Sequence, residues 1–163
     1  MTRVVQGFAD CAGAWQAVLG GPQPLADAAW LCWILFWRLT LRGAKHAMPL
    51  PALVRIVRRT AGGPLDQARA GLRQRLVSEW FARRSPMLPG NCLERSLLVH
   101  ATWARAIGST RLMVGFRSAG RTTHGHTWVT SEGELLLERA DEIAGFEPAC
   151  IFDAYGARLT STP

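Results

Sequence analysis

Hydrophobic residues recur at helical spacing through most of the first 108 positions. The stretch from Pro24 to Leu41 is apolar almost all round, which predicts a buried helix closed by Gly43. A second, basic helix is expected after the prolines at 49 and 51, ending at Gly62 and Gly63. A third begins after Pro64, and the positions expected on its apolar face are Leu65, Ala68, Leu72, Leu76 and Trp80, with Arg73 off that face.

A fourth helix is expected to begin at Cys92 and end at Gly108. Asn91 can cap it, and Glu94, three residues later, can reach back to complete a capping box. The residues predicted on its buried side are Leu93, Leu97, Ala101, Ala104 and Ile107.

From Arg111 the pattern changes to short runs rich in β-forming residues, separated by Ser, Gly and Thr. Residues 111–117, 126–130 and 134–138 therefore predict three antiparallel strands. Helices followed by a small antiparallel sheet define an α+β domain. We expect a single domain over 1–163, with a basic helical region at 1–88, the Cys92 helix and the sheet at 89–145, and a tail at 146–163.

The excess of positive over negative charge lies entirely in the first half of the chain. Residues 1–90 hold twelve Lys and Arg against four Asp and Glu, whereas residues 91–163 hold seven against eight. This asymmetry is typical of a surface facing an acidic partner, a membrane or nucleic acid, and equally of arginines on solvated helix faces. Nucleic-acid binding is not expected, because no helix-turn-helix, zinc finger or RNA-binding strand motif is present.

The cysteines and the N-terminal sequence indicate a cytoplasmic protein. Cys11, Cys32, Cys92 and Cys150 are widely spaced, which is unlike a disulfide framework. The N-terminus has no continuous apolar region typical of a signal peptide. The most apolar run, residues 28–37, is too short for a span of roughly 20 residues, so a core helix is favoured over interfacial membrane contact.

Cys92 is the candidate nucleophile. At the first turn of a helix, unpaired N–H groups and the helix dipole favour an anion, and the thiolate is the reactive form of cysteine. The same N–H groups can hold an oxyanion formed when a carbonyl is attacked. A buried cysteine that acts only as a small hydrophobic residue is the structural alternative.

His126 is the candidate base, with Glu138 as its orienting acid. If residues 131–133 form a three-residue turn with Gly133 in the left-handed conformation, His126 faces Glu138 across the hairpin. A two-residue turn at Glu132 and Gly133 shifts the pairing by one and sends Glu138 to the other face. The sequence leaves both registers open.

These residues carry a family resemblance. The motifs GNCLERSLLVHATWARAIG, RLMVGFR and HGHTWVTSEGELLLE resemble the leader peptidase of lasso-peptide biosynthesis, a stand-alone cysteine protease of the transglutaminase-like superfamily. The match is good over residues 88–140. The chain departs from the family at Thr127, where the family has Ala, and at Glu138, where it has Asp, so Asp141 and Glu142 stay open as substitutes for the acid.

The resemblance implies an activity and its partners. Cys92 would attack the peptide carbonyl at the junction of leader and core, and His126 would protonate the leaving amine. No cofactor or metal is implied. The partners are the leader region of a ribosomally synthesised precursor, a separate small leader-binding protein and an ATP-dependent lasso cyclase that closes the macrolactam.

Three further residues belong to the predicted site as substrate-binding or supporting groups: Asn91, Arg95 and Trp128. Arg95 can help to hold the thiolate or pair with Glu94 or a nearby acid. Trp128 shares the face of His126 and can line the cleft or fill the core. His124 is assigned to the loop before the strand.

Three other functions compete with the peptidase. The same Cys–His pair can transfer the acyl group to an amine, or the fold can act as a peptide-binding scaffold without catalysis. A zinc site from Cys92, His124 and His126, with Cys150, lacks the close ligand pairs of common zinc modules.

Overall fold

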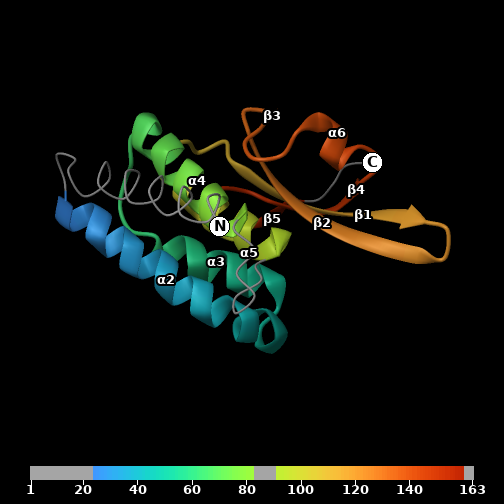
Figure 1. Ribbon diagram of the computed structural model, residues 1–163, viewed down its shortest axis with the longest axis horizontal. Helices are drawn as coiled ribbons and strands as arrows, with labels where there is room; N and C mark the ends of the chain where they lie inside the picture. Colours follow the sequence, from blue (N-terminus) through green and yellow to red (C-terminus); the bar gives the residue numbers. More distant parts are fainter. Residues whose placement is uncertain (1–23, 83–90, 160–163) are drawn as a thin grey trace, which may run out of the picture. The chain divides into compact units, whose positions relative to one another are not determined.

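The computed structural model describes residues 24–82 and 91–159, which form five helices and a five-stranded sheet (Figure 1). This confirms the predicted α+β class. In chain order the elements are α2 (Pro24–Ala47), α3 (Leu50–Thr60), α4 (Gln67–Ala82), α5 (Cys92–Trp103), β1 (Arg111–Ala119), β2 (Thr122–Ser131), β3 (Glu134–Leu135), α6 (Ala140–Ile143), β4 (Glu147–Phe152) and β5 (Arg158–Leu159).

The chain divides into two compact units, Met1–Phe36 and Trp37–Pro163, and the boundary falls inside α2. In the first unit the described residues, 24–36, are all helical. The second unit holds the other elements and every predicted site residue. The single-domain organisation over 1–163 stays a prediction.

The helices begin where the sequence indicates, but four details differ. Helix α5 ends at Trp103 rather than at Gly108, and Ala68, predicted on the apolar face of its helix, is exposed. Helix α2 runs through Gly43 to Ala47 rather than closing at the glycine, since one glycine costs a helix only about 1 kcal/mol. It ends just before Met48, whose position ahead of Pro49 disfavours helical backbone. In α4, Arg73 is buried at 2% exposure beside Ala70 and Val77, so its predicted place off the apolar face is wrong.

The sheet is antiparallel, with strand order β3-β2-β1-β4-β5. The three predicted strands are present, and two more, β4 and β5, occupy the segment predicted as a tail. Strand β2 begins at Thr122, four residues before the predicted start at His126. A tight turn with Gly120 at positive φ lets β1 and β2 pair to their ends, so the predicted loop before His126 is strand.

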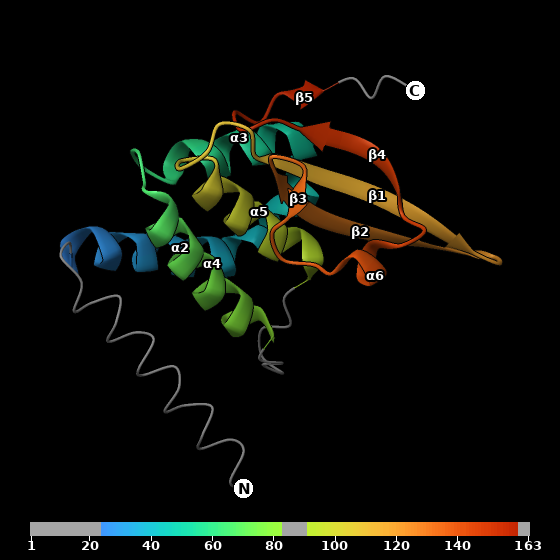
Figure 2. The ribbon, with the colours of Figure 1, turned by 90° about the horizontal axis from the view of Figure 1, so that it is seen from above.

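Helix α5 is the central helix of the larger unit. It packs against α3 and α4 and against strands β1 and β2 (Figure 2). On the sheet, Leu112, Val129 and Phe152 lie side by side in register, and each is at most 1% exposed. The position of α5 beside β2 is therefore fixed by buried contacts.

None of the helices that the structure describes has the length and apolar content needed to cross a membrane.

Candidate active site

Cys92 is the first residue of α5 and is half-buried. The cap predicted for Asn91 is confirmed, since its side-chain oxygen accepts a hydrogen bond from the Glu94 N–H at 2.9 Å. The N–H of Arg95 bonds the Asn91 carbonyl at 3.2 Å. Among the described residues, the first-turn N–H groups of Cys92 and Leu93 therefore remain as donors for an anion beside the thiol.

The second half of the predicted capping box is wrong. The Glu94 side chain does not reach back to Asn91 but is buried at 2% exposure against α2. Its carboxylate pairs with Lys45 at 2.9 Å and with Arg38 at 3.9 Å. The carboxylate thus binds two cations instead of the Asn91 N–H. These ion pairs fix the start of α5 to the second half of α2.

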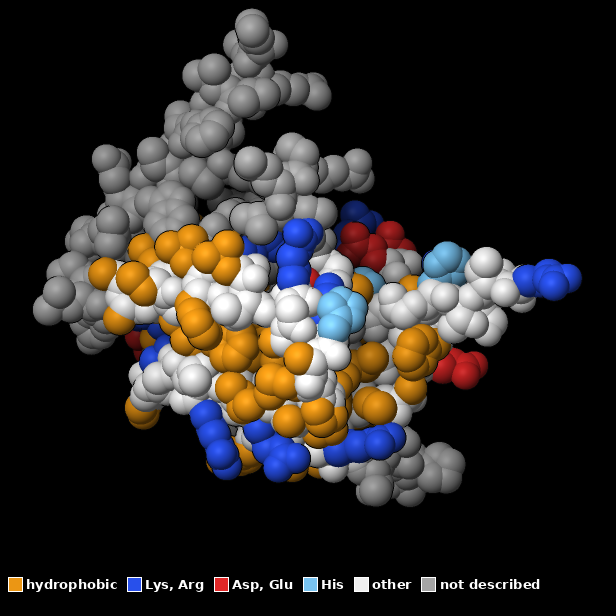
Figure 3. All heavy atoms as spheres, turned by 90° about the horizontal axis from the view of Figure 1, so that it is seen from below, with side chains coloured by type: hydrophobic (Ala, Val, Ile, Leu, Met, Phe, Trp, Pro, Cys, Tyr) orange, Lys and Arg blue, Asp and Glu red, His pale blue; other side chains and the backbone are white. Residues whose placement is uncertain are grey.

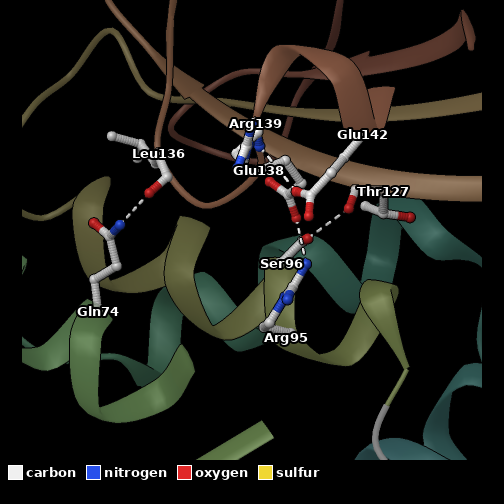
Figure 4. A network of polar contacts seen from close by, with 8 residues as sticks. All are labelled: Gln74, Arg95, Ser96, Thr127, Leu136, Glu138, Arg139 and Glu142. Atoms are coloured by element: carbon white, nitrogen blue, oxygen red, sulfur yellow. Dashed lines mark hydrogen bonds and ion pairs between the residues drawn. The ribbon is translucent and has the colours of Figure 1, made fainter. Parts of the chain in front are cut away.

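A hydrogen bond ties the Cys92 helix to the His126 strand. The hydroxyl of Ser96, which is buried, donates to the main-chain carbonyl of Thr127 at 2.8 Å. Ser96 lies four residues after Cys92, on the same side of the helix. Since Thr127 is the neighbour of His126, the first turn of α5 lies at the part of β2 that carries the imidazole (Figure 4).

His126 lies within an aromatic cluster on β2. Its ring stacks on Trp128 with centroids 6.2 Å apart and lies 5.2 Å from the ring of Phe146. Side chains alternate along a strand, so His126 and Trp128 share one face while Thr127 and Val129 point to the other. The predicted shared face of His126 and Trp128 is thus confirmed, and the tryptophan is buried at 4% exposure.

The glycine opposite His126 makes room for this cluster. Gly115 pairs with His126 across β1 and β2. A Cβ at Gly115 would lie 2.7 Å from the Trp128 ring and 2.7 Å from the Glu147 carbonyl oxygen. The ring of Trp128 can therefore lie over the sheet only because residue 115 has no side chain.

Burial and neighbouring cations keep His126 neutral. Desolvation lowers the pKa of His126 below 6.5, and Arg95 and Arg117 lower it further, while Glu142 opposes them. The Arg95 side chain of α5 thus lies within electrostatic range of the imidazole. His126 Nε2 is buried and has no hydrogen-bond partner among the described residues, and no hydrogen bond joins it to Cys92.

Of the two registers that the sequence left open, the structure has the one that does not place Glu138 opposite His126. Ser131 pairs with Glu134 and Thr130 with Leu135, which is the register of a two-residue turn. Glu132 and Gly133 form that turn, both with positive φ, and β3 ends at Leu135. Glu138 therefore lies beyond the strand and is not opposite His126.

Contacts with two helices draw the chain away from the sheet after β3. Gln74 of α4 donates to the Leu136 carbonyl, and Arg95 of α5 binds the Glu138 carboxylate at 2.5 Å (Figure 4). Glu138 is 6% exposed, and burial raises the pKa of its carboxyl group above the usual range despite the cation. Of the partners predicted for Arg95, the structure thus gives a nearby acid. Whether Glu138 acts in catalysis stays a prediction.

The structure adds two residues that the sequence did not single out, Ser96 and Phe146, and it shows an effect of Glu142, one of the acids that the sequence left open. Ser96 was part of a recognised motif without an assigned role, and its spacing from Cys92 was the available signal. Nothing in the sequence pointed to Phe146, because this residue contacts His126 only after the segment between β3 and β4 has passed across the sheet. Glu142 acts on His126 electrostatically, and its side chain caps α6 through the N–H of Arg139 at 2.9 Å.

The alternative metal site does not assemble in the part of the chain described. Across residues 24–82 and 91–159, no three His, Cys, Asp or Glu side chains gather so as to hold a metal ion. His124 lies on β2, not in a loop, and is exposed at hydrogen-bond distance from the Thr122 hydroxyl, 3.3 Å. Cys11 lies outside the described residues.

A helix that begins at a cysteine and lies against a strand bearing a histidine is the arrangement of a cysteine-dependent acyl-transfer domain. The sequence matches the family model of the transglutaminase-like superfamily over residues 29–150, three quarters of the chain, so the chain belongs to that superfamily. Its members are generally cysteine proteases or acyltransferases. No curated protein and no solved structure matches the chain.

Proposed function

We propose that this protein is a cysteine peptidase that removes the leader from a ribosomally synthesised lasso-peptide precursor, before a separate cyclase forms the macrolactam. The observation that carries the peptidase is the Ser96–Thr127 hydrogen bond, because it joins the helix beginning at Cys92 to the strand bearing His126. The restriction to lasso-peptide leaders rests on the sequence motifs around Cys92 and His126. A leader-binding protein and the cyclase are the proposed partners, and the cytoplasm is the proposed location.

The reaction has two steps. The Cys92 sulfur attacks the carbonyl carbon of the scissile peptide bond, and the oxyanion accepts from the N–H groups of Cys92 and Leu93. The C–N bond breaks as His126 gives a proton to the departing amine, which leaves a thioester. Water, losing a proton to His126, then attacks the thioester and releases the leader with a free carboxylate.

His126 is suited to this role by its environment. Its lowered pKa keeps the imidazole neutral at neutral pH, so that it can accept the thiol proton. The rings of Trp128 and Phe146 fix its orientation from two sides. Glu138 and Glu142 are the candidate acids that complete the catalytic group, Glu138 by sequence position and Glu142 by its electrostatic effect on His126.

The test is cleavage of the precursor encoded beside this protein, with and without its leader-binding protein, followed by mass spectrometry. We expect two products whose masses add up to the precursor plus one water. Cys92→Ala and His126→Ala should abolish cleavage, whereas Glu138→Ala should leave a measurable remnant. Full activity of Cys92→Ala would refute the peptidase.

Two outcomes would point to the alternatives. A product carrying an added amine in place of water would identify an acyltransferase. Iodoacetamide labelling of Cys92 no faster than of Cys32 or Cys150 would identify a peptide-binding scaffold, because only a catalytic thiol needs the environment of the helix start.

A further inference from the structure

Strand β2 has an open edge on the side away from β1. The next strand, β3, pairs only with Thr130 and Ser131 of β2, and the Leu136 N–H adds one bond to the Val129 carbonyl. In the described part of the chain, residues 122–126 have no strand beside them on this side. The open edge therefore runs through the residues that lead up to and include His126.

The turn between β1 and β2 determines which main-chain groups point to this edge. Gly120 and Arg121 form a two-residue turn closed by the pair Ala119 and Thr122, so the even-numbered residues of β2 bond to β1. The odd-numbered residues point outward, as the bonds accepted by the Val129 and Thr127 carbonyls show.

The outward groups form a short ladder without a partner. They are the N–H and carbonyl of Thr123 and of Gly125, and the N–H of Thr127, for which the described contacts contain no main-chain partner. Thr123 and Gly125 are exposed. Outward groups that repeat every second residue match the hydrogen-bonding repeat of an extended peptide.

This edge meets the catalytic helix at one end. Ser96 of α5 bonds the Thr127 carbonyl, and Cys92 lies one turn earlier on the same side of the helix, roughly 6 Å along the axis. An added strand that follows β2 past Gly125 therefore leads to the first turn of α5. The main chain of that strand would reach the thiol without needing any particular side chain.

The hairpin that presents the edge is basic. Residues 111–131 contain three arginines and no Asp or Glu. Beyond Phe116 the hairpin extends past the end of β4, and Figure 3 shows it as a mostly polar protrusion with a basic side chain at its end. A peptide bearing acidic side chains is the complementary occupant.

We propose that the outer edge of β2, from Thr123 to Thr127, binds an acidic peptide segment as an additional β-strand and so delivers the scissile bond to Cys92. This inference rests on the proposed peptidase function for its purpose, but the binding itself does not require catalysis. The N–H of Gly125 is the central donor of the site.

The test removes that single donor. The test uses a Cys92→Ala background. Gly125→Pro deletes an outward N–H and leaves the β1–β2 hydrogen bonds intact, because residue 125 does not bond to β1. Proline is tolerated at such a position on a free edge. The probe is a fluorescein-labelled degenerate peptide mixture enriched in Asp and Glu, with a Lys-enriched mixture beside it, and binding is followed by anisotropy. We expect Gly125→Pro to weaken binding of the acidic mixture about fivefold or more, and the Lys-enriched mixture to bind more weakly than the acidic one.

Two matched controls separate the lost donor from side effects. Gly125→Ala adds a Cβ at the same place, 3.3 Å from the exposed Phe116 ring, but keeps the N–H. Ser118→Pro removes an outward N–H from the opposite edge of the hairpin, across from Thr123. Both should bind the acidic mixture within about twofold of the parent protein, and equal affinities for Gly125→Pro and Gly125→Ala would overturn the proposal.

A second measurement does not depend on whether Gly125→Pro folds. It follows amide hydrogen exchange in the Cys92→Ala variant, in which Gly125 is unchanged. Adding the acidic mixture should slow exchange at the Gly125 and Thr127 amides and leave the Ser118 amide unchanged. If amide exchange at the edge instead slows as the protein concentration rises, without any peptide, a second copy of the protein occupies the edge and the proposal is overturned. Edge binding without cleavage would refute only the peptidase, and cleavage without edge binding only this inference.

Discussion

At the scale of single residues, charge placement defines the surroundings of the candidate site. Glu94 and Glu138 are both buried acids, and each is held by a cation from another element, Lys45 and Arg95 respectively. His126 is instead surrounded by rings and cations. The neutral form of the His126 imidazole is consequently favoured over a charged form paired with an acid.

Replacing Arg117 should change the titration of His126. Arg117 lowers the pKa of His126, so Arg117→Gln should raise that pKa and move the acid limb of the activity profile to higher pH. Arg117→Lys keeps the charge and should leave the limb in place. The measurement is the NMR titration of the His126 ring proton, and an unchanged pKa in Arg117→Gln would contradict the electrostatic reading.

Neutralising Glu94 should destabilise the protein. Glu94→Gln removes the carboxylate partner of Lys45 at a position only 2% exposed, so we expect a loss of about 3 kcal/mol in the free energy of unfolding. Urea denaturation measures it. The surface pair of Arg139 and Asp141 is the control, since Asp141→Asn should cost less than about 1 kcal/mol. Equal losses in the two variants would show that burial of the pair is not what matters.

At the scale of elements, the junction of α5 and β2 is the decisive contact. It depends on one buried hydrogen bond, Ser96 to Thr127, and the face of β2 that carries His126 depends on the space that Gly115 leaves for Trp128. Neither feature concerns a reacting atom. Under the proposed function, both position Cys92 and His126.

Removing the hydrogen bond between Ser96 and Thr127 should lower both stability and activity, and the loss of activity should be the larger effect. Ser96→Ala leaves the Thr127 carbonyl without its donor and should cost about 1 to 2 kcal/mol of stability. It should also lower kcat, because the first turn of α5 is no longer fixed against β2. Ser131→Ala is the control, since the buried Ser131 hydroxyl has no partner among the described residues. Parental kcat in Ser96→Ala would show that the bond does not position the site.

Two Gly→Ala changes should have opposite signs. Gly115→Ala forces a Cβ to 2.7 Å from the Trp128 ring and the Glu147 carbonyl, so we expect a loss of about 1 to 3 kcal/mol and reduced activity. Gly43→Ala meets nothing within 4 Å inside helix α2 and should stabilise the protein by about 0.5 to 1 kcal/mol. Thermal unfolding of both variants tests the pair, and a stabilised Gly115→Ala would refute the proposed packing.

At the scale of the whole molecule, a buried histidine should make stability depend on pH. His100 of α5 is 1% exposed, lies 3.0 Å from the Asp153 carbonyl through Nε2, and burial lowers its pKa to about 4. The unfolded chain binds this proton near pH 6.5, so protons favour unfolding between the two values. Stability should therefore fall as the pH drops from 6.5 to about 4, and His126 contributes with the same sign.

The loss attributed to His100 is about 3 kcal/mol over that range. Urea denaturation at a series of pH values measures it, and His100→Gln should flatten the curve. His124→Gln, at an exposed position on β2, should leave the curve unchanged. A curve for His100→Gln as steep as that of the parent would assign the pH dependence to other groups.

The sequence predicted local features well and pairings between distant segments poorly. The cap by Asn91, the helix starting at Cys92 and the shared face of His126 and Trp128 follow from patterns within a few residues. The side-chain partners of Glu94 were mispredicted, because Lys45 lies 49 residues away in the chain. The sequence left the register at Glu138 open, because one residue more in the turn moves every following side chain to the other face of the sheet.

The sequence alone determined the α+β class, a cysteine at a helix start and a histidine on a strand, since these depend on periodicity and capping. Only the tertiary structure decided which acid meets which cation, that Phe146 lies against His126, and that no strand from the described residues pairs with the outer edge of β2 at 122–126. The physical reason is that helix and strand formation are set by near neighbours. Buried ion pairs, ring contacts and free strand edges depend instead on how the chain returns to the same place in space.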